Sequence, residues 1–205
     1  MKIRTALELS LIDYPGKMAA VVFVPGCGFR CPACHAGPIL EGPPLVDEEE
    51  FFSRLSGLRR WTSGVVVCGG EPTGREDLVP FLRRLKRDGF SVKLDTNGSA
   101  PGVLGRLLDE GLVDYAAMDV KAPRALFPEV AGVPADLLPA VEESIRIVRR
   151  FPDHEFRTTV VPVARRGGEI SFLTVSEIGE TAAMIAELTG SSGHKYYLQK
   201  FVPRK

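Results

Sequence analysis

The chain has 205 residues, of which 44% are hydrophobic and 25% charged, and this is enough for one domain with a sizeable core. Its 26 basic side chains balance 26 acidic ones, so no net charge would attract nucleic acid or anionic lipid. No apolar run approaches the roughly 18 residues of a membrane span, and residues 1–10 lack the apolar core of a signal peptide. We therefore expect a cytoplasmic protein with neither a nucleic-acid nor a membrane partner.

Strand-like runs rich in β-branched and aromatic residues recur six times along the chain. They cover residues 19–24, 64–68, 90–95, 113–119, 155–161 and 196–202. Amphipathic stretches between them predict five helices, and the first and last carry capping signals: Asp47 with Glu50, and Thr174 with Glu177 before Gly190. The apolar stripes of the five helices are Phe51, Phe52, Leu55 and Leu58; Leu78, Phe81, Leu82 and Leu85; Val103, Leu104, Leu107 and Leu108; Leu138, Val141, Ile145 and Val148; and Ile178, Ile185 and Leu188.

Strand–helix alternation of this kind predicts a parallel sheet, because a crossover helix joins neighbouring parallel strands. Six strands in 205 residues fall short of the closed eight-stranded barrel, which takes about 250 residues. We therefore predict an α/β fold, a partial (β/α)6 barrel of the TIM type with parallel strands, as a single domain over residues 1–205. Segments 121–136 and 163–173, which contain Pro or Gly, are predicted as loops.

Three of the four cysteines, Cys27, Cys31 and Cys34, lie on one loop after the first predicted strand, in a C-x3-C-x2-C spacing. Clustered cysteines in a cytosolic chain indicate metal or redox chemistry rather than disulfides. A structural zinc site takes four protein ligands, and an electron-transfer iron–sulfur cluster normally takes four cysteines. Three thiolates around a four-iron cluster would leave one iron open for a ligand that is not protein. The fourth cysteine, Cys68, is predicted to be a buried apolar residue ending the second strand.

Further residues that could bind a ligand follow the next three predicted strands. They are Gly69-Gly70-Glu71-Pro72, Asp95-Thr96-Asn97-Gly98 and Asp119-Val120-Lys121. The C-terminal ends of the strands form the catalytic face of a (β/α) barrel, so this arrangement predicts an enzyme. Each motif also has a plainer interpretation, as a tight glycine turn, an Asx turn or a surface lysine. In a ligand pocket, the glycines would let a ligand approach the backbone, Glu71 would accept from an amino group, and Lys121 would neutralise a carboxylate.

The segments GCGFRCPACH, GGEP, LDTNG and MDVKAP, in this order, resemble the radical S-adenosylmethionine (SAM) superfamily. Within it, LELSLIDYPGKMAAVVFVPGCGFRCPACH resembles the activases of glycyl radical enzymes, in particular the group that activates anaerobic ribonucleoside-triphosphate reductase. The resemblance runs from about residue 7 to the terminal LQKFVP and covers nearly the whole chain.

The resemblance implies a [4Fe–4S] cluster held by Cys27, Cys31 and Cys34, with SAM bound to the fourth iron through its amino and carboxylate groups. A flavodoxin- or ferredoxin-type donor would reduce the cluster, and cleavage of the SAM C5′–S bond would give methionine and a 5′-deoxyadenosyl radical. In an activase, that radical takes a hydrogen atom from a glycine Cα of a partner glycyl radical enzyme. The radical chemistry belongs to the cofactors, so no catalytic side chain beyond them is expected.

Seven positions would contact SAM according to the resemblance: Gly69, Gly70, Glu71, Asp95, Asn97, Asp119 and Lys121. Gly70 and Glu71 would contact the SAM amino group, and Asn97 and Lys121 its ribose or carboxylate end. The two aspartates would share a role beside SAM, around a monovalent cation. The chain departs from the family pattern at Ala33, where an aromatic residue is common, and at Ala36, where related activases usually have Asn.

Two other functions remain open on the sequence. One is a radical SAM enzyme that acts on a small molecule and resembles 7-carboxy-7-deazaguanine synthase, although the LIDYPGK stretch argues against it. The other is a zinc-binding interaction module that uses the three clustered cysteines with His35 or Cys68. Because only Cys68 is left over, activases with additional ferredoxin-like clusters are excluded.

Overall fold

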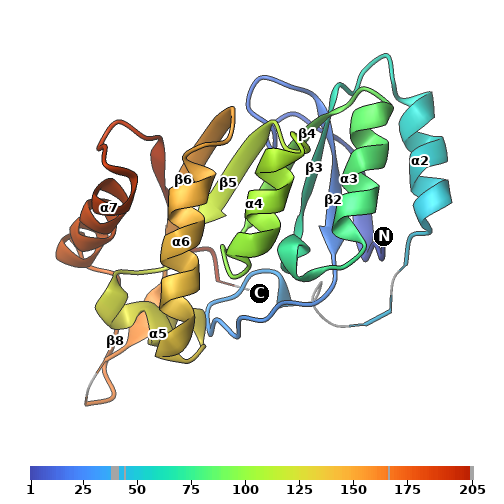
Figure 1. The fold of residues 1–205 in the computed structure, drawn as a ribbon. Coiled ribbons are helices and arrows are strands. Elements are labelled where there is room, and N and C mark those ends of the chain that lie inside the picture. The colour runs from blue at the N-terminus through green and yellow to red at the C-terminus, as the bar shows by residue number, and fades with distance from the viewer. Residues whose placement is uncertain (38–41, 44, 166, 204–205) are drawn as a thin grey trace.

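The computed structural model describes residues 1–37, 42–43, 45–165 and 167–203, and Figure 1 shows their arrangement as a sheet with helices packed against it. The seven strands of the main sheet lie in the order β1-β2-β3-β4-β5-β6-β9. These are β1 (Thr5–Ser10), β2 (Ala19–Val24), β3 (Gly64–Gly69), β4 (Ser91–Thr96), β5 (Tyr115–Asp119), β6 (Asp153–Val160) and β9 (Tyr196–Lys200). Strands β2 to β6 and β9 are parallel neighbours in chain order. The predicted partial (β/α)6 barrel with parallel strands is therefore confirmed, and the ends of the predicted strands differ by two residues at most.

One strand of the main sheet was not predicted. Strand β1 pairs antiparallel with β2, so the sheet is mostly rather than wholly parallel. A separate two-stranded hairpin, β7 (Pro162–Ala164) with β8 (Ile170–Phe172), occupies the segment 163–173 that was predicted as a loop, in which residue 166 lies outside the described residues.

The helices are α2 (Glu48–Gly57), α3 (Leu78–Arg87), α4 (Pro101–Asp109), α5 (Phe127–Ala131), α6 (Leu138–Val148) and α7 (Val175–Thr189), with short 3-10 turns η1 (Pro72–Gly74), η2 (Arg124–Leu126) and η3 (Ala135–Leu137). Asp47 caps α2 through hydrogen bonds from the backbone of Glu49 and Glu50, as predicted. The predicted capping box of Thr174 and Glu177 opens α7. Helix α5 and the turn η2 lie in segment 121–136, and η3 begins there, so the prediction of a simple loop is wrong.

The alternation of side chains along each strand decides which residues face the helices. In Figure 1, α3, α4 and α6 lie over one face of the sheet. On β4, Val92 and Leu94 are fully buried in the large core on that face. Because neighbouring side chains of a strand point to opposite faces, Lys93 and Asp95 lie on the inner face of the partial barrel. The same alternation on β6 buries Phe156 in the core and places Arg157 on the inner face.

Candidate functional site

A cavity of about 400 Å³ opens at the C-terminal ends of the parallel strands. All ten residues that the sequence singled out for cluster or SAM binding line it: Cys27, Cys31, Cys34, Gly69, Gly70, Glu71, Asp95, Asn97, Asp119 and Lys121. They come from the loop after β2 and from the ends of β3, β4 and β5. The structure therefore brings the predicted residues together, while the role of each remains a prediction.

The turn after β3 holds one side of the cysteine loop through backbone contacts. The amide of Gly70 donates to the carbonyl of Val24 at 2.8 Å, and the amide of Glu71 donates to the carbonyl of Gly26 at 2.8 Å. A Cβ atom on Gly70 would overlap the Gly26 carbonyl oxygen, and Gly69 has φ of +108°. What approaches these glycines closely is therefore the chain itself, which explains why side chains are absent there.

Helix α5 holds the other side of the cysteine loop. The amide of Arg30 donates to the carbonyl of Ala131 at 3.1 Å, and the rings of Phe29 and Phe127 meet edge to face with centroids 5.9 Å apart. Gly132 ends α5 in the left-handed region, at φ of +63°, and a Cβ there would overlap the Arg30 carbonyl oxygen. The loop is thus fixed between two backbone segments, one after β3 and one at α5.

The thiols on this loop differ in their surroundings. The sulfur of Cys27 accepts from the backbone amide of Phe29 at 3.3 Å and from the side-chain amide of Asn97 at 3.5 Å. The sulfur of Cys31 lies 3.4 Å from the carbonyl oxygen of Ala131. Burial raises the pKa of both thiols. A bound metal reverses this effect, because a coordinating thiol is deprotonated outright.

The donor set fits a [4Fe–4S] cluster. Three of the four cysteines line one cavity from a single loop. In the described ranges, no three His, Cys, Asp or Glu side chains converge on a point that would suit one metal ion. A cluster of four irons does not need that convergence, because each cysteine sulfur binds a different iron.

Glu71 connects the turns after β3 and β4. Its side chain is only 3% exposed, and its carboxylate accepts from the Thr73 amide at 3.0 Å and the Thr73 hydroxyl at 2.6 Å. It also accepts from the Thr96 hydroxyl and from the Asn97 backbone amide, each at 2.7 Å. Burial raises the pKa of this carboxyl despite the four hydrogen bonds. A carboxylate has about four acceptor positions, so most of its capacity is used within the protein.

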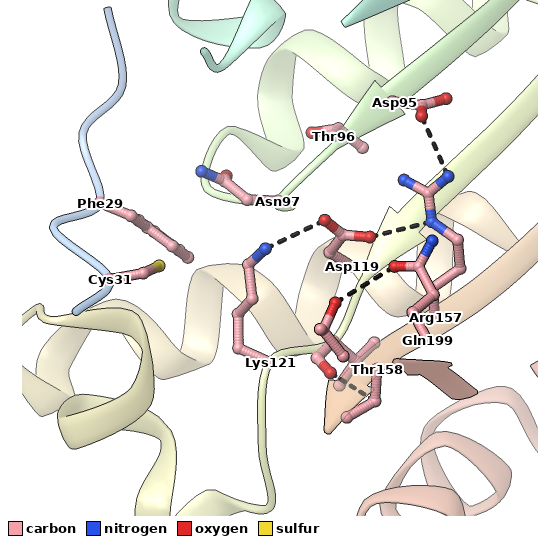
Figure 2. A network of polar contacts seen from close by, with 12 residues as sticks. Phe29, Cys31, Asp95, Thr96, Asn97, Asp119, Lys121, Arg157, Thr158 and Gln199 are labelled. Carbon is pink, nitrogen blue, oxygen red and sulfur yellow. Dashed lines mark hydrogen bonds and ion pairs between the residues drawn. The ribbon is translucent and has the colours of Figure 1, made fainter. Parts of the chain in front are cut away.

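A charged network fills the inner side of the cavity (Figure 2). The guanidinium of Arg157 lies between two carboxylates, donating to Asp119 at 2.9 Å and to Asp95 at 3.0 Å. Lys121 donates to the other oxygen of Asp119 at 3.0 Å, and Lys93 pairs with Asp95. Although burial opposes ionisation, Lys121 and Arg157 hold the pKa of Asp119 well below its usual range. The positive charge between the two aspartates in this structure is that of Arg157.

Sequence reasoning missed Arg157, together with Thr159 and Gln199, which also line the cavity. A usable signal was present, because position 157 lies on a predicted strand next to the core residue Phe156 and is therefore directed inward. Cys68 lies near the end of β3, as predicted, but it is only partly buried and lines the cavity, so the prediction that it is buried is wrong.

The two positions that depart from the family pattern, Ala33 and Ala36, also line the cavity. Ala33 packs against a small apolar cluster that includes Val130 and Val161. The ring of His35 lies 5.2 Å from that of Phe201, centroid to centroid, so the C-terminal segment covers this part of the loop.

Six parallel strands in chain order, with a thiol-bearing loop after the first of them, define a partial (β/α) barrel whose cavity suits an iron–sulfur cluster. The chain belongs to the radical SAM superfamily, whose family model matches residues 21–184. A [4Fe–4S] cluster and SAM are the cofactors that this family implies. No helix in the described part of the chain has the length and apolarity of a membrane span.

Several named proteins are similar in sequence to this chain. A protein of Methanocaldococcus jannaschii named "Putative glycyl-radical enzyme activating enzyme MJ1227" is 36% identical over 162 residues, which cover 76% of this chain and 67% of that protein. The pyruvate formate-lyase-activating enzyme of Clostridium pasteurianum is 30% identical over 58% of this chain and 52% of its own length. The 7-carboxy-7-deazaguanine synthase of Koribacter versatilis is 33% identical over 43% of this chain and 39% of its own length. The chain thus spans about two thirds or less of these relatives.

Solved structures support the fold. TYW1 with a lysine-pyruvate adduct bound has a TM-score of 0.59 at 14% identity, covering 90% of this chain and 65% of that one. SuiB of Streptococcus suis bound to precursor peptide SuiA has a TM-score of 0.64 at 13% identity, and the match covers 89% of this chain and 38% of SuiB. At these identities the likeness concerns the fold alone.

Proposed function

We propose that this protein installs a glycyl radical on a partner enzyme by reductive cleavage of SAM, within one radical SAM domain over residues 1–205. The chemistry is supported by one observation above all, the gathering of three thiols and a set of charged side chains around a single cavity. The partner class is supported by the relatives named as activating enzymes, one of them 36% identical.

In this proposal Cys27, Cys31 and Cys34 hold the cluster, and SAM occupies the rest of the cavity. When bound, the cluster supplies one electron to the SAM sulfonium. Lys121, whose pKa Asp119 and Cys31 raise although burial opposes the charge, stays positive and provides a partner for the SAM carboxylate. Since protein donors already engage the Glu71 carboxylate, the backbone carbonyls of Gly69 and Gly70 would accept from the SAM amino group in this proposal.

Room for a substrate continues beyond the charged network. A second cavity of about 300 Å³ shares Asp95, Arg157 and Gln199 with the first and reaches the connection between β1 and β2 at Ile12 and Asp13. This connection is exposed, with Ile12 89% accessible. The sheet is open between its edge strands β1 and β9, which would let a polypeptide loop of the partner enter from the side.

The test is anaerobic incubation of the reconstituted protein with SAM, a reductant and a candidate partner that carries a glycyl radical motif. We expect an electron paramagnetic resonance (EPR) doublet from a glycyl radical on the partner, and none with a Cys31→Ala variant. Formation of 5′-deoxyadenosine without a glycyl radical, across all candidate partners, would contradict the activase assignment while leaving SAM cleavage intact.

A second function, radical chemistry on a small polar molecule, is supported by the charged lining of the second cavity and by the partial similarity to 7-carboxy-7-deazaguanine synthase. Lys93, Glu155 and Arg157 would bind such a substrate. Under this alternative, a small molecule rather than a protein would stimulate 5′-deoxyadenosine formation. The electron donor, of flavodoxin or ferredoxin type, and a monovalent cation beside Asp95 and Asp119 remain predictions under both functions.

A further inference from the structure

We propose that Asn97 tunes the iron–sulfur cluster: its side-chain amide donates a hydrogen bond to the Cys27 sulfur and raises the reduction potential, and Glu71 holds it in position. The proposal rests on the assignment of Cys27, Cys31 and Cys34 to a cluster, and it does not depend on the identity of the partner. It gives Asn97 and Glu71 functions that differ from direct contact with SAM.

The orientation of the Asn97 amide is fixed by its other end. Its oxygen accepts from the backbone amide of Ser99 at 2.9 Å, so the opposite, NH2 end points to the Cys27 sulfur at 3.5 Å. Asn97 is only 6% exposed, so little water competes for its amide hydrogens. A hydrogen bond in such a site is electrostatically stronger than one in water.

The turn that carries Asn97 is itself braced. The hydroxyl of Thr96 accepts from the amide of Gly98 at 3.1 Å, and the hydroxyl of Ser144 on α6 donates to the carbonyl of Gly98 at 2.6 Å. Gly98 has φ of +75°, and a Cβ there would overlap the side chain of Met118. The position of the Asn97 side chain relative to β4 and α6 is therefore well determined.

Glu71 fixes both partners of the amide–sulfur contact. Its carboxylate accepts from the Asn97 backbone amide at 2.7 Å, and its own backbone amide donates to the carbonyl of Gly26, next to Cys27, at 2.8 Å. One residue thus ties the donor turn and the acceptor loop to each other. Glu71 is a positioning residue, which acts on the cluster through Asn97.

The electrostatic consequence follows from the charge of the reduced state. One-electron reduction adds negative charge to a cluster and its sulfur ligands, and hydrogen bonds to the sulfurs are among the factors that set the potential. An N–H donor stabilises the more negative form, so the Asn97 amide favours reduction. Cys27 receives two such donors, from Phe29 and Asn97, whereas Cys31 lies against a carbonyl oxygen.

The test is the midpoint potential of the reconstituted cluster, measured without SAM or partner by anaerobic EPR titration. In Asn97→Ala we expect the equilibrium constant for reduction to fall about tenfold, which is about 59 mV for one electron. Asn97→Asp keeps the acceptor for the Ser99 amide but replaces the donor with an anion, and its potential should be lower still. Thr96→Val removes, with no change of charge, the hydroxyl that joins Glu71 to the turn carrying Asn97, and it should also lower the potential.

The matched control is Gln199→Ala, which removes an amide that lines the same cavity and bonds to Thr159 instead of a cysteine. Its potential should match the wild type. Potentials of both Asn97 variants within error of the wild type would overturn the proposal. Loss of the cluster from both variants would also overturn it, because a donor that only tunes the potential leaves three cysteine ligands in place. Absence of any cluster in the wild type would instead refute the function proposed above.

Discussion

At the level of single residues, Arg157 supplies the positive charge between Asp95 and Asp119. Its side chain is 13% exposed and bonds two carboxylates that come from different strands. Without a cation between them, Asp95 and Asp119 would be two like charges in a poorly solvated site, which is unfavourable. The guanidinium geometry suits this position because it offers donors in fixed directions to both acids.

Replacing Arg157 with Gln should destabilise the fold by about 2 kcal/mol. This loss of stability is smaller than that usually caused by removing one partner of a fully buried ion pair, because both aspartates line the cavity. Urea denaturation at neutral pH measures the change. Arg83→Gln, which removes an exposed pair with Glu110, is the control and should leave the midpoint almost unchanged. Equal changes in the urea midpoint for the two substitutions would show that the network around Arg157 stabilises the fold no more than an exposed ion pair does.

Asp119 should make the folding stability of the protein depend on pH in the acidic range. Its pKa in the folded state lies below the ordinary value of 3.8, so the folded protein resists protonation more than the unfolded chain does. Its contribution is therefore present above the ordinary pKa and is lost as the pH falls from about 5. We expect Asp119→Asn to be less stable than the wild type at pH 7 but to lose less stability on acidification. Parallel urea midpoints for the two proteins between pH 7 and pH 3 would contradict this.

The residues that line the cavity could be predicted from the sequence better than the hydrogen bonds between them. All ten singled-out residues line the cavity, because the C-terminal ends of neighbouring parallel strands must meet. The contacts of Glu71 with the turn after β4 and the bridge made by Arg157 could not be predicted, because they join residues 25 to 62 positions apart whose alignment depends on strand register. A turn motif indicates where a carboxylate lies but not which donors surround it.

At the level of elements, the cysteine loop depends on two close backbone approaches. Gly70 and Gly132 each leave space for a carbonyl oxygen of the loop, that of Gly26 and that of Arg30. Both contacts accompany backbone hydrogen bonds from or to the loop. The loop geometry is therefore set by the turn after β3 and by α5, before any cofactor binds.

Gly70→Ala should lower the iron content of the reconstituted protein severalfold, because the new Cβ displaces the loop that bears Cys27. Gly74→Ala is the matched control, since it adds the same methyl group in the same turn with nothing within 4 Å of the Cβ. Iron analysis with circular dichroism separates loss of the site from loss of the fold. Full iron content in the Gly70 variant would contradict the role given to this contact.

The elements that escaped prediction share a physical reason. Strand β1 is an edge strand with only one buried residue, Ser10, so it lacks the apolar pattern that marks buried strands. Helix α5 has five residues, too few for a helical period to be recognised. Strands β7 and β8 have three residues each and form only through pairing with each other. Strands β2 to β5 were predictable because most of their residues are buried. Strands β6 and β9 are more exposed and were recognised from their β-branched and aromatic residues.

At the level of the whole molecule, the apolar residues of the main core and the charged residues beside the cavities lie on opposite faces of the sheet. Its helix-covered face holds the large apolar core, and its inner face carries the charged residues of β4 and β6 beside both cavities. An open sheet with a polar interior provides an entry that a closed, packed barrel would lack. The cysteine loop closes one end of this interior, so cofactor and substrate would meet within it.

The most direct measurement is the metal content and SAM chemistry of the anaerobically reconstituted protein. We expect about four irons and four sulfides per chain, and 5′-deoxyadenosine after reduction with SAM present. Cys27→Ala, Cys31→Ala and Cys34→Ala should each abolish the product, while Cys68→Ala should retain the cluster. One zinc per chain without iron or sulfide, or product formation that survives loss of the three loop cysteines, would contradict the assignment.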